Sequence, residues 1–188
     1  MKIGNSYMQK QYIKSVSLSS THSFSKKAAD NITLVEGLGV EGDAHFGKTV
    51  KHRYLVRKNP TKPNLRQVHL IHYELIEELN GKGFSVSEGD LGENITTVGI
   101  ELLNLPTNTI LKIGEDAVIQ ITGLRDPCVL IDRFQKGLLK AVVEKDKNGN
   151  VIRKTGVMGI VQKSGKVNID DEIKIIYPQK PYKKLDCV

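Results

Sequence analysis

The sequence contains no tryptophan, and aromatic residues make up only 5% of its 188 residues. Proteins that bind single-stranded nucleic acid commonly stack the bases on exposed aromatic rings. The scarcity of aromatic residues therefore argues against such a surface, and we do not expect nucleic acid as the main partner.

Long hydrophobic runs are also absent from the sequence. No segment approaches the roughly 20 apolar residues that a membrane helix needs. The first residues, 1–6, lack the apolar core of a signal peptide. We therefore expect a cytoplasmic protein that does not enter a membrane.

Cysteine occurs only twice, as Cys128 and Cys187. Two cysteines, one of them next to the end of the sequence, do not form a disulfide framework. In a reducing compartment a single thiol is more often catalytic or ligating than paired. Cys128 is therefore the first candidate for a functional residue, and the alternative is a small buried apolar residue, as free cysteines often are.

Acidic residues are missing from the segment 48–66, which carries seven cations. These are Lys48, Lys51, Arg53, Arg57, Lys58, Lys62 and Arg66. Because the whole chain has a net charge of +7, the rest of it is neutral. A localised basic segment attracts anions such as phosphate, nucleic acid or a membrane surface, although many such segments are only solvated loops.

The segments that are present predict one domain that is mainly β with a few helices (α+β). Short alternating apolar runs follow one another at spacings of about ten residues, which is typical of a β-barrel or sandwich. Apolar residues at helical spacing predict a helix over 68–79, followed by a weaker one over 134–142. We expect a closed or partly closed β-barrel of mixed strands within 1–188, with its core at 35–177 and a loose basic tail at 178–188.

Cys128 follows one of the predicted strands. An alternating run ends at Gly123, and Arg125 and Pro127 then precede the cysteine. The thiolate is the reactive form of a cysteine, whose free pKa is about 8.5, and a neighbouring cation lowers that value. Arg125 is the local cation, and Asp126 opposes it unless its side chain points away.

Residues 42–49 match the phosphate-loop pattern G-x-x-x-x-G-K-[ST]. That pattern holds phosphates when it lies between a buried strand and a helix. The clustered cations and two prolines of residues 50–63 disfavour such a helix. We therefore interpret the match as accidental, with a nucleotidase as the alternative.

Several short motifs occur in a fixed order along the chain. They are Gly42-Asp43-Ala44-His45-Phe46-Gly47, Arg66-Gln67-Val68, Gly89-Asp90-Leu91-Gly92-Glu93-Asn94-Ile95-Thr96, Ile113-Gly114, Arg125-Asp126-Pro127-Cys128 and Gly165-Lys166-Val167-Asn168-Ile169-Asp170-Asp171. The ordered set resembles the MOSC domain, the C-terminal module of molybdenum-cofactor sulfurases that also occurs as small free-standing proteins. The resemblance covers roughly residues 35–177.

The resemblance implies a barrel-like fold that binds a molybdenum–pterin cofactor (molybdopterin) and uses one essential cysteine, here Cys128. In sulfurase-type relatives this module handles sulfur, whereas in relatives that reduce N-hydroxylated compounds the thiolate ligates molybdenum. We therefore expect a sulfur transferase or an oxidoreductase, with Cys128 as sulfur carrier or molybdenum ligand. The matching cofactor-site positions are His45, Arg66, Glu93, Asn94 and Arg125.

No aminotransferase-like domain accompanies these motifs, so the resemblance implies a separate cysteine desulfurase or a redox partner. Pyridoxal phosphate binding is carried over only as an association of the family. A hypothesis of a different class is an anion-binding or nucleic-acid-binding module that acts through the basic segment 48–66.

Overall fold

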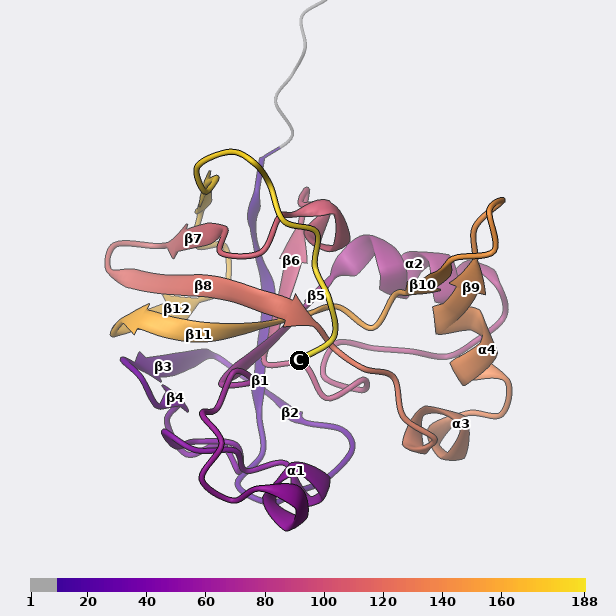
Figure 1. Cartoon of the computed structure of the whole chain (residues 1–188), viewed down its shortest axis with the longest axis horizontal. Coiled ribbons are helices and arrows are strands. Elements are labelled where there is room, and N and C mark those ends of the chain that lie inside the picture. Colours follow the sequence, from indigo (N-terminus) through magenta and orange to yellow (C-terminus); the bar gives the residue numbers. More distant parts are fainter. Residues whose placement is uncertain (1–9) are drawn as a thin grey trace, which may run out of the picture.

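A computed structural model describes residues 10–188, and its central feature is an eight-stranded sheet (Figure 1). The strand order is β13-β7-β8-β11-β5-β6-β1-β2. The bounds are β1 Tyr12–Leu18, β2 Lys27–Ala29, β5 Val68–His72, β6 Ile95–Val98, β7 Ile110–Ile113, β8 Ala117–Leu124, β11 Val157–Lys163 and β13 Ile173–Ile176. All neighbouring strands pair antiparallel except β5 and β6, which are parallel.

Two smaller sheets complete the β structure. One has the order β12-β3-β4 and the other is the hairpin β10-β9. The bounds are β3 Asn31–Val35, β4 Gly39–Val40, β9 Val143–Lys145, β10 Val151–Arg153 and β12 Gly165–Asn168. The mainly β fold agrees with the sequence, but a closed barrel is not confirmed. Within residues 10–188 no sheet closes on itself, and an isolated bridge between Tyr12 and Glu172 links β1 to the chain just before β13.

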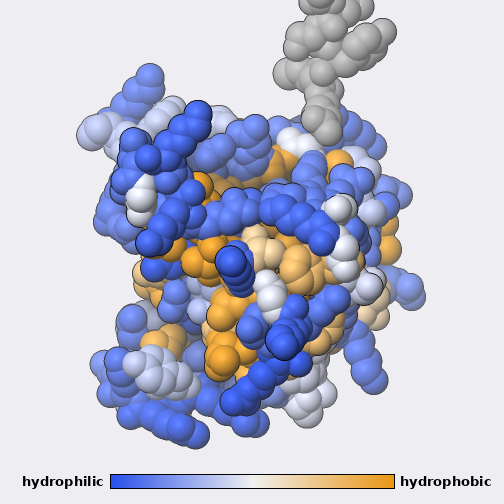
Figure 2. All heavy atoms as spheres, turned by 90° about the vertical axis from the view of Figure 1, so that its right-hand side faces the viewer, coloured by the Kyte–Doolittle hydropathy of each residue, from blue (hydrophilic) through white to orange (hydrophobic). Residues whose placement is uncertain are grey.

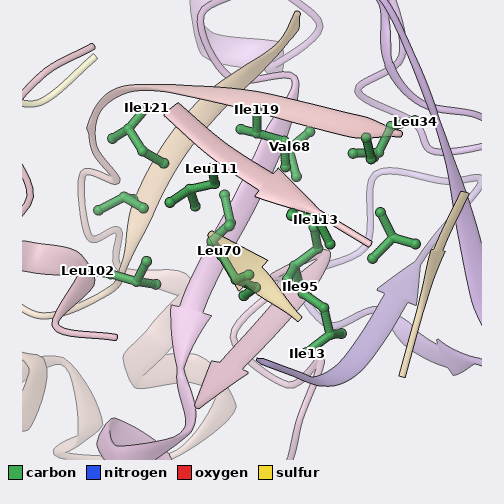
Figure 3. Close-up of a cluster of buried hydrophobic side chains, with 14 of the residues drawn as sticks. Ile13, Leu34, Val68, Leu70, Ile95, Leu102, Leu111, Ile113, Ile119 and Ile121 are labelled. Carbon is green, nitrogen blue, oxygen red and sulfur yellow. The ribbon is translucent and has the colours of Figure 1, made fainter. Parts of the chain in front are cut away.

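The main core lies on one face of the large sheet. β8 alternates buried and half-buried residues along its whole length, and Ile119 and Ile121 lie in one buried cluster with Leu111 of β7 and Leu70 of β5 (Figure 3). Burying a side chain of this size stabilises the fold by about 1.5–3 kcal/mol. The end of β8 therefore has a firmly packed base, from which the chain continues to Cys128.

The helices are short and lie outside this core, except that Leu102 of the 3₁₀ turn is part of it. They are α1 Arg53–Lys58, α2 Tyr73–Gly81, the 3₁₀ turn η1 Leu102–Asn104, α3 Leu130–Phe134 and α4 Leu138–Val142. A second apolar cluster joins α2, α3 and α4 to Ile71 of β5. No helix among the described residues is long and apolar enough to cross a membrane.

The helix expected over 68–79 is wrong at its start. Residues 68–72 form strand β5, and the helix α2 begins only at Tyr73. Val68 and Leu70 contribute to the main core, whereas Ile71 contributes to the second cluster, so the strand is buried on both faces. A strand buried on both faces has apolar residues on both and loses the simple alternation, which is why a helical spacing fitted it.

The C-terminal segment differs from the expected loose tail. Leu185 is only 3% exposed, and the backbone N–H of Thr107 donates to Lys183 at 2.8 Å. Leu124, at the end of β8, donates to Asp186 at 2.8 Å, and Val188 donates back to Leu124 at 3.3 Å. The last residues thus lie against the end of β8, where Figure 1 shows the yellow segment crossing the strand.

Candidate functional site

A cavity of about 530 Å³ lies where β8 ends. Its walls come from residues 23–26, from the segment that leads into α1, from β5, from the turn before β6, from the segment that follows β8, and from the chain's last residues. The lining residues that carry chemistry are Lys26, His45, His52, Arg66, His69, Asn94, Arg125, Asp126, Cys128 and Cys187.

The cavity brings together five of the six predicted site residues. Cys128, Arg125, Arg66, Asn94 and His45 all line it. These residues are up to 83 positions apart in the sequence, so their convergence depends on the fold rather than on local motifs. The sixth predicted residue, Glu93, is not among the lining residues.

Glu93 lies behind the cavity wall and is only 1% exposed. Its Oε1 accepts hydrogen bonds from the Gly89 N–H at 2.5 Å and from the Thr96 hydroxyl at 3.3 Å. Burial raises the pKa of Glu93, and its Oε2 has no hydrogen-bond partner among the described residues. The structure therefore gives Glu93 the task of holding the 89–92 turn, not of reaching the cavity.

Asn94 lines the cavity, but its side chain is already occupied. Its Nδ2 donates to the Ser17 carbonyl at 3.1 Å and to Asp43 Oδ2 at 3.0 Å. Its Oδ1 accepts from the His69 N–H at 3.2 Å. Because an amide nitrogen has two hydrogens, Asn94 has no donor left for a ligand. It joins β1, β5 and the loop that carries Asp43.

Asp43 was not predicted as a site residue, yet it organises one wall. The Lys26 ammonium lies 2.6 Å from its Oδ2, and the side chains of the pair are 5% and 1% exposed. Its Oδ1 accepts from the His45 N–H at 2.9 Å and lies 3.1 Å from His45 Nδ1. Burial opposes the charge of Asp43, but hydrogen bonds from His45 and the Lys26 ammonium outweigh it and lower the pKa of Asp43 below its usual range.

The sequence carried a partial signal for Asp43. An Asp that accepts from the backbone N–H two residues later forms an Asx turn, and Asp43 stands two residues before His45. No local pattern links Asp43 to Lys26, which lies 17 residues earlier in the sequence. Burial lowers the pKa of Lys26, and the neighbouring Asp43 offsets this only in part.

Arg125 is held by its backbone beside the cysteine. Its N–H donates to the Gly156 carbonyl at 3.0 Å, and its carbonyl accepts from the Thr155 hydroxyl at 3.0 Å. Its Nη1 is buried and has no partner among the described residues. Burial lowers the pKa of Arg125, and a negative charge at Cys128 opposes this change. A guanidinium remains charged even so, and the free Nη1 can therefore donate to an anion.

Asp126 does not neutralise Arg125 by a direct contact. Its side chain is 61% exposed, and its Oδ1 lies 3.6 Å from Nε of Arg153. An exposed pair of this kind is weak because solvent screens it. Asp126 thus forms no ion pair with Arg125, although its charge still acts on Arg125 and Arg66.

Arg66 and His52 bring further nitrogen atoms to the cavity. Arg66 Nε donates to the Val188 carbonyl at 2.5 Å. Burial and the nearby charge of Arg66 lower the pKa of His52 to about 4, so its ring is neutral at pH 7. His52 Nδ1 is buried and without a partner among the described residues. Two unpaired nitrogen atoms, on His52 and Arg125, thus belong to side chains that line one cavity.

Cys187 also lines the cavity, a position that the sequence gave no means of predicting. It forms an isolated parallel bridge with Leu124, four residues before Cys128. Its Sγ lies 3.9 Å from Oδ1 of Asp126. Burial raises the pKa of the Cys187 thiol.

The side of the molecule that carries α3 and α4 has an apolar centre. Figure 2 shows hydrophobic residues in the middle of this face, surrounded by hydrophilic ones. On α3 and just before it, Val129, Leu130 and Phe134 are exposed, and Leu130 also lines the cavity. One rim of the cavity is therefore apolar, while its interior carries cations.

Residues 42–49 do not have the surroundings of a phosphate loop. The strand before them, β4, has only two residues, and α1 begins at Arg53 rather than at the Lys48-Thr49 pair. Thr49 instead forms a bridge with Pro63, which closes the basic loop. The helix N-terminus that would bind phosphate is missing at this place.

The described residues contain no cluster of three or more His, Cys, Asp or Glu side chains that could hold a metal ion. A metal at this site would therefore bring most of its ligands with it. Thiolate is the softest ligand that a protein offers, and Cys128 supplies one.

Comparison with known families gives a match between residues 41–174 and the model of the MOSC domain. The match covers well over half of the chain. This chain belongs to the MOSC domain family. As a family, MOSC domains are associated with the molybdenum cofactor, and the resemblance found in the sequence is confirmed.

Solved structures have the same fold as this MOSC domain. The YuaD protein from Bacillus subtilis is 24% identical, with 91% of this chain and 98% of that chain covered and a TM-score of 0.72. YiiM from Escherichia coli is 20% identical, with 93% and 74% covered and a TM-score of 0.61. YiiM from Geobacillus stearothermophilus is 16% identical, with 88% and 75% covered and a TM-score of 0.62. A comparison with curated proteins gives no match.

The MOSC match does not include every wall of the cavity. Phe24 and Lys26 lie before it, and Cys187 and Val188 lie after it. The thiol Cys128 and the cations Arg66 and Arg125 lie within it. The central chemistry therefore belongs to the MOSC part of the chain, and two flanking segments complete the enclosure.

Proposed function

We propose that this MOSC domain binds a molybdenum–pterin cofactor in the cavity and acts on it through the Cys128 thiolate, as a sulfur carrier or as a molybdenum ligand. The observation that supports the proposal is the shared cavity of Cys128, Arg66 and Arg125. Burial lowers the pKa of both guanidinium groups, and a negative charge at Cys128 opposes this change in each, which supports an electrostatic interaction of the two cations with the sulfur.

The cavity has the size and the donors that such a cofactor needs. Its volume of about 530 Å³ lies within the range of roughly 300–1,000 Å³ of small-molecule sites. Arg66 and Arg125 would hold the phosphate, because guanidinium groups form strong charge-assisted hydrogen bonds with phosphate oxygens. His52 Nδ1 has no partner among the described residues and would meet a polar edge of the pterin. When bound, the cofactor would supply a metal centre with sulfur and redox chemistry.

In this proposal the other predicted site residues support the cavity walls. His45 and Asn94 are both bound to Asp43, and Glu93 holds the turn next to them. They fix the position of the cavity wall relative to Cys128. The pterin-binding role expected for Glu93 and Asn94 is replaced by this supporting role, because neither has a free donor facing the cavity.

Molybdenum content tests the proposal. The chain is expressed with and without its Cys128→Ser substitution in a host that makes the cofactor, and molybdenum is measured per mole of purified protein. We expect wild-type protein to retain molybdenum and the variant to lose most of it if Cys128 is a ligand. Arg125→Gln should also lower retention, and Arg133→Gln, at an exposed position on α3, serves as its matched control.

The two roles of Cys128 give different results in the same preparations. A sulfur carrier shows a persulfide on Cys128 by alkylation and mass spectrometry, and the Cys128→Ser variant keeps its cofactor. A ligand shows loss of molybdenum in the variant, together with loss of any reduction of N-hydroxylated compounds. Wild-type protein that contains neither cofactor nor persulfide would contradict the proposal.

A further inference from the structure

Both cysteines of the chain line the same cavity. Cys128 follows β8 directly, whereas Cys187 comes from the far end of the sequence. Burial lowers the pKa of the Arg66 guanidinium, and negative charges at Asp126, Cys187 and Cys128 oppose this change, so Arg66 lies within electrostatic reach of both sulfurs. The two thiols therefore line one cavity together with a cation.

The position of Cys187 is fixed by the backbone. Its neighbours Asp186 and Val188 hydrogen-bond with Leu124 on both sides, at 2.8 and 3.3 Å. Leu185 anchors the segment in the main core at 3% exposure. A Cβ added to Gly123 would collide with the Asp186 carbonyl and lie 2.6 Å from Val188 Cγ1. The segment can approach β8 this closely only because residue 123 lacks a side chain.

We propose that Cys128 and Cys187 form a reactive dithiol in which Cys187 resolves an oxidised Cys128. A hydroperoxide transfers its terminal oxygen to the Cys128 thiolate, which becomes a sulfenic acid, and the hydroperoxide leaves as water or an alcohol. The Cys187 sulfur then attacks the Cys128 sulfur. The S–O bond breaks, the S–S bond forms, and the oxygen leaves as water. The two thiols lose two electrons in total, and the hydroperoxide gains them. A small thiol then reduces the disulfide back to the two thiols.

This dithiol lies beyond the proposed cofactor chemistry and does not depend on it. A sulfenic acid at Cys128 would oxidise further to an irreversible sulfinic acid if no second thiol intercepted it. Cys187 lines the same cavity and would intercept it. The disulfide would preserve the sulfur of Cys128 in a reducible form while keeping it from any other partner in the cavity.

The test uses full-length, reduced, cofactor-free protein treated with one equivalent of hydrogen peroxide and then with an excess of it. We expect a loss of two hydrogen masses and a peptide in which Cys128 is linked to Cys187, reversed by glutathione. In Cys187→Ser the same treatment should leave a sulfenic acid that reacts with dimedone, followed by sulfinic acid. Equal sulfinic acid formation in wild type and Cys187→Ser would overturn the proposal, as would disulfides only between molecules.

A backbone variant keeps both thiols and tests their placement. Gly123→Ala should displace the terminal segment and slow formation of the linked peptide by about tenfold or more, because intramolecular reactions are sensitive to small displacements. Gly81→Ala is the matched control, since a Cβ there meets nothing within 4 Å. Equal rates in both variants would contradict the placement. Because no molybdenum is involved, failure of the dithiol leaves the cofactor proposal untouched, and the reverse also holds.

Discussion

Removal of the Asp43 carboxylate should destabilise the whole cavity wall. Asp43 and Lys26 are buried together, at 1% and 5% side-chain exposure, and their charged atoms are 2.6 Å apart. Asp43→Ala leaves the ammonium without its counter-ion and leaves Asn94 Nδ2 and the His45 N–H without their acceptor. Breaking a buried pair in this way costs about 3–5 kcal/mol. We expect the free energy of unfolding in urea to fall by that amount at pH 7.

The double variant Lys26→Met with Asp43→Ala distinguishes the effect of the uncompensated Lys26 charge from the effect of the lost hydrogen-bond acceptor. Removing the ammonium abolishes its uncompensated burial, so the double variant should be more stable than Asp43→Ala alone. Asp116 is the control, since its pair with Lys163 is 62% and 58% exposed and exposed pairs contribute only about 0–1 kcal/mol. A loss below about 1 kcal/mol for Asp43→Ala, or no recovery in the double variant, would refute the reasoning.

The same pair sets the direction of the pH dependence. Because the pKa of folded Asp43 is lowered, the carboxylate stabilises the wild type above the unfolded pKa of about 4. That contribution is lost as the pH falls below this value. In Asp43→Ala burial lowers the pKa of Lys26 without the opposition of Asp43, so the unfolded state binds more protons than the folded state. The stability of this variant should therefore rise from pH 7 to pH 9, in urea titrations where wild type changes less.

Two further predictions concern Glu93 and the basic segment. Burial raises the pKa of Glu93, so its negative charge opposes folding above the unfolded pKa. Glu93→Gln should therefore raise the free energy of unfolding at pH 7 but not at pH 4. A lower free energy of unfolding at pH 7 in urea denaturation would contradict this. None of the residues of α1 is buried, and none of the residues 48–66 is acidic. Any binding of nucleic acid by the segment 48–66 should therefore weaken steeply as the salt concentration rises. A titration with labelled oligonucleotide that does not depend on salt would exclude that function.

The strands around Cys128 could be predicted from the sequence because their signals are local. The alternation along β8 depends on neighbouring residues, although the strand does not end at Gly123 as expected but continues to Leu124. The family motifs likewise led to Arg66, Arg125 and Cys128, which the structure brings into one cavity. Site residues whose chemistry differs from that of their neighbours can be recognised in this way from the sequence alone.

The remaining parts depend on contacts between distant segments. The apolar residues of Val68–His72 fit a helical spacing in the sequence. In the structure they form a strand with both faces buried, one of them against the second apolar cluster. Lys26 and Cys187 lie on segments whose polar composition suggested loops. Their positions follow from pairing with Asp43 and Leu124, which no pattern within those segments reveals.

Both flanking segments pack closely against glycines in the MOSC part of the chain. A Cβ at Gly92 would lie 2.6 Å from the Phe24 carbonyl, just as one at Gly123 would collide with Asp186. The flanks thus approach the backbone of the MOSC part closely, and the buried side chain of Lys26 also pairs with Asp43. Selectivity for what enters the cavity can therefore change through Ser23, Phe24 and Cys187, while Lys26, Cys128 and the two arginines stay in place.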